Sequence, residues 1–117
     1  GNTSRAEDRQ LLPLLFSRDS SLWVRRYSAE TVPPYVCQEL TATLARVGVD
    51  RMVVGHTPQP RGISSACHGA VWRIDTGMSA WFAGYTNREI QVLEIARGAA
   101  PTVLKESDTH RTQPAQV

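Results

Sequence analysis

The stretch that decides the fold is Met52-Val53-Val54-Gly55-His56-Thr57-Pro58-Gln59. Three apolar residues lead into a glycine, and a histidine follows where the chain must turn. This pattern predicts a buried β-strand over residues 52–54 that delivers an imidazole to the carboxyl end of the strand. Because ligands of open α/β sheets gather at that edge, His56 is the first candidate for a functional residue.

The strongest helix signal lies directly upstream of this strand. Pro34 suits the first position of a helix, and Gly48 is a candidate C-cap. Between them, apolar residues recur on one helical face, at Val36, Leu40, Leu44 and Val47. A helix, a short turn and a strand form an αβ unit, which predicts an α/β fold whose sheet is covered by helices.

The remaining elements are shorter. Strands are expected over residues 63–67, 70–75, 90–95 and 102–105. His68-Gly69 would form the tight turn between the first two of these strands. Upstream, residues 7–16 predict a helix interrupted by Pro13, and residues 22–27 predict a short strand or extended segment. The polar residues 106–117 are expected to be a disordered tail, which leaves residues 1–105 as the folded domain.

Bulk composition excludes several classes of function. The 117 residues suit one domain, and 13 basic residues against 11 acidic ones are too balanced to indicate nucleic-acid or membrane binding. No apolar run approaches the roughly 18 residues of a membrane span. The polar start without methionine suggests that the chain begins inside a longer gene product. Cys37 and Cys67 are too few for a disulfide scaffold, so we expect reduced thiols and, by default, a cytoplasmic location.

His56 itself allows two interpretations. A neutral imidazole at a strand end is a common metal ligand, and Gly55 lets the backbone pass close to an ion or a phosphate. Alternatively, the histidine simply caps a loop. A zinc site that combines His56 with Cys67 and His68 is a weaker idea, because their spacing fits no structural zinc pattern.

Five short motifs keep a characteristic order and spacing along residues 20–96: Leu22–Tyr27, Val53–Gln59, Gly62-Ile63, Cys67–Gly69 and Val71–Ser79. Together they resemble the C-terminal part of the calcineurin-like metallophosphatases, and in particular the bacterial-type branch called Shewanella-like protein phosphatases. The resemblance implies a partial αββα metallophosphoesterase sandwich. This chain would be its C-terminal portion, a helix–strand unit followed by mainly antiparallel strands.

The resemblance also implies a two-metal phosphatase in which a metal-bound hydroxide attacks a phosphate monoester. The family's Gly-His-Thr histidine is a metal ligand and corresponds to His56. Two divalent ions (manganese, iron or zinc) would be present in the whole enzyme. An arginine that holds the substrate phosphate corresponds to Arg25, although a solvated surface charge is the alternative there.

Supporting roles fall to residues close to these two positions. Thr57 and Gln59 would shape the loop beside the metal, and Gly55 would let the backbone pass close to the ion. Asp75 would orient a metal ligand without itself binding the metal, or would only form the turn before Gly77. Gly77 would allow two loops to approach closely.

The chain also departs from the family pattern. Ahead of His56 it lacks the family's other ligand motifs, which are Asp-x-His, Gly-Asp-x-x-Asp, Gly-Asn-His-Glu and a histidine before Gly-Gly. It therefore supplies one ligand, and we expect it to be inactive without the missing N-terminal part of the same domain. The expected substrate is a protein phosphorylated on Ser/Thr or Tyr. Small phosphorylated metabolites, or a non-catalytic fragment or decayed domain that binds or stabilises a partner, are the alternatives.

Overall fold

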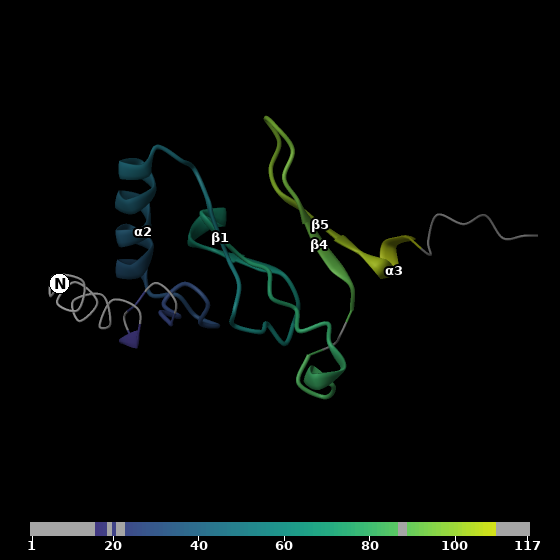
Figure 1. Ribbon diagram of the computed structural model, residues 1–117. Coiled ribbons are helices and arrows are strands. Elements are labelled where there is room, and N and C mark those ends of the chain that lie inside the picture. Colours follow the sequence, from purple (N-terminus) through teal and green to yellow (C-terminus); the bar gives the residue numbers. More distant parts are fainter. Residues whose placement is uncertain (1–15, 19, 21–22, 87–88, 110–117) are drawn as a thin grey trace, which may run out of the picture.

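The computed structural model describes residues 16–18, 20, 23–86 and 89–109 (Figure 1). Its regular elements are, in chain order, α2 (Pro34–Val47), β1 (Met52–Val54), β2 (Ser64–Ala66), the 3₁₀ turn η1 (Cys67–Gly69), β3 (Val71–Arg73), the 3₁₀ turn η2 (Ala80–Phe82), β4 (Gln91–Glu94), β5 (Thr102–Lys105) and α3 (Glu106–Thr109). None of the helices in this described part is long and apolar enough to cross a bilayer.

The described strands form two separate sheets. In the first, β3 lies in the centre, parallel to β1 and antiparallel to β2. Its register pairs Met52 with Val71 and Ser64 with Arg73. In the second, β4 and β5 form an antiparallel hairpin, which extends away from α2 in Figure 1. The expected α/β class with mainly antiparallel strands after the helix–strand unit is confirmed.

The helix α2 begins and ends as its sequence predicts. Pro34 occupies the first turn, and Gly48 adopts the left-handed conformation at φ 78° while its N–H donates to the carbonyl of Leu44. The helix buries Leu40 and Leu44 against Val71 of the central strand, and this cluster is the core of the described chain.

Two predictions about burial are wrong. The strand β1 is not buried on both sides, because Val53 is 43 % exposed and its neighbours are only half-buried. The alternation of side chains along a strand explains this, since α2 covers only one face of the sheet. Val47 lies in the last turn of α2 and is exposed instead of continuing the apolar face.

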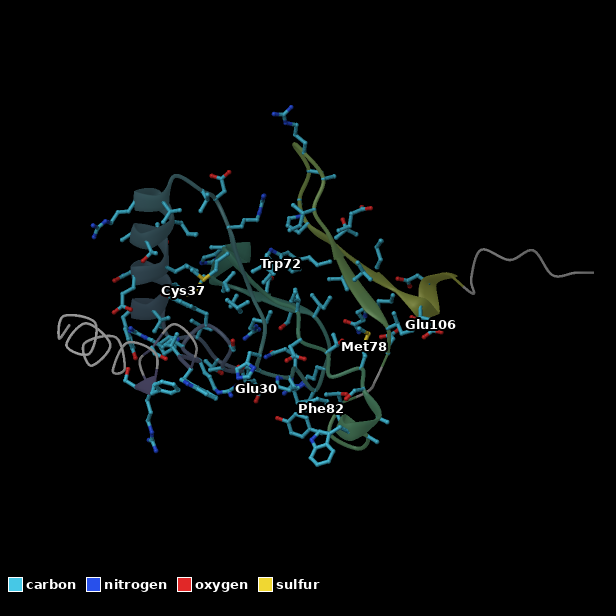
Figure 2. The ribbon with its side chains drawn as sticks, viewed as in Figure 1. Glu30, Cys37, Trp72, Met78, Phe82 and Glu106 are labelled. Carbon is cyan, nitrogen blue, oxygen red and sulfur yellow. A yellow bond between two sulfur atoms is a disulfide. The ribbon has the colours of Figure 1, made fainter. Side chains whose placement is uncertain are left out.

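Cys37 and Cys67 form a disulfide, so the expectation of two reduced thiols is wrong. The bond joins α2 to η1, and Figure 2 shows its sulfur atoms between the helix and the sheet. The two cysteines are 30 residues apart in the sequence, and only the fold brings their Cα atoms to 5.2 Å. The cytosol-like setting inferred from reduced thiols loses its support.

Other segments differ in detail from the expectations. Residues 23–28 form turns, with the N–H of Ser28 donating to the carbonyl of Arg25, and not the expected strand. Two adjacent arginines in this segment keep it at the surface. Residues 106–109 form the single turn α3. The expected helix over residues 7–16 lies outside the described residues apart from residue 16, as do residues 110–117 of the expected tail.

Candidate functional site

The structure places His56 where the sequence predicts it, just beyond the carboxyl end of β1. Gly55 follows the strand, and both Gly55 and His56 are exposed. The backbone of His56 is left-handed, with φ 62°. A residue with a Cβ atom adopts this conformation at a cost, so its surroundings must hold it there.

Arg25 supplies part of that support. Its Nη1 donates hydrogen bonds of 2.7 Å to the backbone carbonyl of His56 and to Oγ1 of Thr57. Hydrogen bonds from a charged donor are stronger than those between neutral groups. The turn segment that carries Arg25 is therefore tied to the His56 loop across 31 residues of sequence. The sequence singled out all three residues but did not predict that they are joined.

Trp23 contacts the His56 ring directly. The two ring centroids lie 5.7 Å apart and the planes meet at 66°, which is an edge-to-face arrangement. The contact limits the rotation of the imidazole. Trp23 belongs to the same sequence motif as Arg25, and that shared motif is the signal that could have identified it.

Gln59, which the sequence named only as a residue that shapes this loop, fixes the far end of the loop through contacts that the sequence did not predict. Its buried side chain donates from Nε2 to the carbonyls of Thr57, at 2.8 Å, and Ser28, at 3.2 Å. Its backbone N–H donates to the carbonyl of Asp75 at 2.7 Å. The loop between His56 and Gln59 is consequently held from the turn segment on one side and from the end of β3 on the other.

Asp75 forms the turn that was one of its two predicted roles. Its Oδ1 accepts the N–H of Gly77 at 3.1 Å. Gly77 is buried and left-handed at φ 57°, and a Cβ atom there would lie 3.0 Å from side-chain atoms of Phe82 and Thr86. The glycine thus permits a close approach of two segments, whereas none of the hydrogen bonds and ion pairs of the described residues joins Asp75 to the His56 side chain.

An open cavity of about 760 Å³ lies beside this loop. Its lining combines polar groups with apolar ones and includes Trp23, Arg25, Tyr27, Val54, His56 and Thr57. Cavities of this size are typical of sites for small ligands. The structure therefore brings a candidate metal ligand and a candidate phosphate-binding cation to one cavity.

The described residues do not by themselves form a metal centre. No three histidine, cysteine, aspartate or glutamate side chains in the described ranges gather closely enough to hold an ion. His56 offers one imidazole, and a dinuclear site needs several further ligands. The zinc idea that used Cys67 is wrong, because the disulfide takes up its sulfur.

Comparisons with known proteins identify relatives over most of the chain. It is 33 % identical to Shewanella-like protein phosphatase 2 of Arabidopsis thaliana, over 80 % of this chain and 23 % of that protein. It is 29 % identical to an uncharacterized protein of Schizosaccharomyces pombe, over 87 % of this chain and 29 % of that protein. It is 43 % identical to Shewanella-like protein phosphatase 1 of Plasmodium berghei, over 54 % of this chain and 18 % of that protein.

The chain thus spans about a quarter of the length of the curated relatives that it matches. No family model and no solved structure matches it. The resemblance identified in the sequence is confirmed by the two named relatives.

Proposed function

Because this chain is related to the Shewanella-like protein phosphatases, we propose that it forms part of a metal-dependent phosphatase that hydrolyses phosphate monoesters on proteins, at Ser/Thr or Tyr. The observation that carries the proposal is the cavity shared by His56 and Arg25, with Arg25 bonded to the backbone of His56. The imidazole of His56 suits a divalent ion, and the guanidinium of Arg25 suits a phosphate.

His56 is assigned as one metal ligand. The two bound ions would supply Lewis-acid activation of the phosphate and of water. The relatives extend well beyond the matched segment, and we assign the remaining ligands to that part of the whole protein. The contact with Trp23 and the bonds to the loop hold the imidazole at the cavity before any ion binds, which lowers the entropy cost of binding.

Arg25 has donors for two tasks. A guanidinium carries five N–H groups, and the two on Nη1 bond to the His56 loop. The groups on Nη2 and Nε can bind a phosphate while Nη1 keeps its bonds. The residue then positions the ligand loop and binds the substrate at the same time.

The test is turnover of an aryl phosphate by the full-length gene product, with and without added Mn²⁺. We expect metal-dependent turnover in the wild type and its loss in His56→Ala. Arg26→Gln is a control outside the cavity and should keep its turnover, because Arg26 is exposed and forms its ion pair with Glu39 on α2 and not with the loop. Metal-dependent turnover that survives His56→Ala would remove His56 from the metal site.

A non-catalytic role for this segment alone is the second candidate. It is favoured by the lack of a metal-binding cluster among the described residues. The two candidate functions are distinguished by measuring the turnover of phosphopeptides and of small phosphorylated metabolites by the full-length gene product. Turnover of neither class, with metal present, would favour a domain that only binds or stabilises.

A further inference from the structure

Arg73 is a buried cation that forms no ion pair with the residues that the structure describes. It lies on the central strand β3 and is 7 % exposed. Its Nη1 and Nη2 donate to the carbonyls of Ala29 and Ser65, while its Nε has no hydrogen-bond partner in the described structure. The ion pairs of the described residues join Arg26 to Glu39 and Arg61 to Glu30, and neither includes Arg73.

Such an arrangement is costly in a protein that binds nothing there. A buried charge is normally paired, and a buried polar atom without a partner calls for an explanation. Burial also lowers the pKa of Arg73, which reports the desolvation of its charge. The two carbonyl bonds satisfy part of the guanidinium but leave its charge uncompensated.

Arg73 forms part of the wall of a second cavity, of about 460 Å³. Ser64, Arg61 and Tyr85 contribute further polar groups to the wall, and Glu30, the carboxylate in it, is the partner of Arg61. The titratable lining therefore has two cations and one anion, an excess of positive charge. This cavity shares Ser28 and Thr57 with the His56 cavity, so the two adjoin.

We propose that this second cavity is an anion subsite that binds an acidic side chain, carboxylate or phosphate, next to the phosphorylated residue of a protein substrate. The inference rests on the proposed function, because it treats the His56 cavity as the place where the phosphate ester is bound. An anion at Arg73 would pair its charge, and the shared Thr57 would let one extended peptide reach both cavities. The subsite makes the enzyme selective for phosphorylated residues with acidic neighbours.

The strand register offers a sharp test. Ser64 stands directly opposite Arg73 in the β2–β3 pair, and both line the cavity. Residues paired in this way lie close enough for opposite charges to interact. Ser64→Asp therefore places a carboxylate of the chain itself beside Arg73 and leaves the bonds to Ala29 and Ser65 in place. Ser64→Asn is the matched control, with nearly the same shape and no charge.

The first measurement compares kcat/KM of the full-length gene product for two phosphopeptides that differ only by Glu or Gln beside the phosphorylated residue. We expect the wild type and Ser64→Asn to favour the Glu peptide by about tenfold, the value of one charge-assisted hydrogen bond. We expect Ser64→Asp to lose this preference and to keep its turnover of an aryl phosphate, which has no second anion. Equal preference in the Asp and Asn variants, or no preference in the wild type, would overturn the proposal.

The second measurement does not depend on turnover. Three forms of the full-length gene product are compared, all with Arg25→Gln and His56→Ala, and with Ser, Asn or Asp at position 64. Inorganic phosphate should raise the Tm of the Ser64 and Ser64→Asn proteins but not that of the Ser64→Asp protein. A phosphate response of equal size in all three proteins, or in none, would refute the subsite. Failure of the proposed function would appear separately, as a wild type without metal-dependent turnover while the three proteins of the Arg25→Gln/His56→Ala background still show this pattern of phosphate binding.

Discussion

The disulfide between Cys37 and Cys67 gives a stability prediction whose size follows from the fold. The bond closes a loop over a sequence separation of 30 residues. In the chain-entropy model, a cross-link over about 30 residues removes about 3.6 kcal/mol of conformational freedom from the unfolded state. Replacing both cysteines by serine should lower the free energy of unfolding by about that amount.

The assay is urea unfolding of the full-length gene product, followed by tryptophan fluorescence. Dithiothreitol should destabilise the wild type to the level of Cys37→Ser/Cys67→Ser and leave that variant unchanged. Loss of the bond should also speed amide exchange in η1, where both Cys67 and His68 have positive φ angles, at 53° and 56°. Cys67 packs against the Leu40, Leu44 and Val71 cluster, but these three residues keep their contacts with one another, so α2 itself should remain protected. Equal stability of the wild type with and without reductant would refute the reasoning.

Two further predictions concern a turn and the hairpin. Gly77→Ala should lower the free energy of unfolding by about 1–3 kcal/mol, because the new Cβ atom would lie 3.0 Å from Phe82 and Thr86 at a left-handed backbone position. Gly48 is also left-handed but has open space around it, so Gly48→Ala is the control. In thermal melts, Gly48→Ala should lower the stability by less than Gly77→Ala does. Hydrogen bonds from Ser107 and Gln91 lower the pKa of the Glu89 carboxyl from its ordinary value. The ionised Glu89 therefore stabilises the fold above the ordinary pKa, and this stabilisation is lost as the pH falls through the lowered pKa. Glu89→Gln should therefore flatten the acid limb of a plot of Tm against pH, and an unchanged limb would contradict this cause.

Local chemistry explains what the sequence could predict. Pro34 and Gly48 act within one turn of α2, so both of its ends are readable from the sequence. The strand expected over residues 70–75 is present as β3, and the alternation of side chains along a strand places Val71 and Arg73 on one face, where both are buried. Residues 22–27 are predicted to form a short strand or extended segment, whereas residues 23–28 form turns with local hydrogen bonds such as that from the N–H of Ser28 to the carbonyl of Arg25.

Long-range contacts explain what the sequence could not predict. The position of His56 follows from its place after a strand, but its bond to Arg25 joins residues 31 positions apart. The disulfide partner of Cys37 and the uncompensated charge of Arg73 likewise depend on how α2, β2 and β3 come together. A sequence motif therefore identifies residues of the site, but their contacts with one another can be read only from the structure.

The double hydrogen bond from Nη1 of Arg25 has a thermodynamic consequence. One atom holds both the carbonyl of His56 and the hydroxyl of Thr57, so a displacement of the guanidinium also displaces the loop that carries the imidazole. In the proposed enzyme, the affinity for the metal and the affinity for the phosphate would then be linked. By reciprocity, each ligand would change the affinity for the other by the same factor.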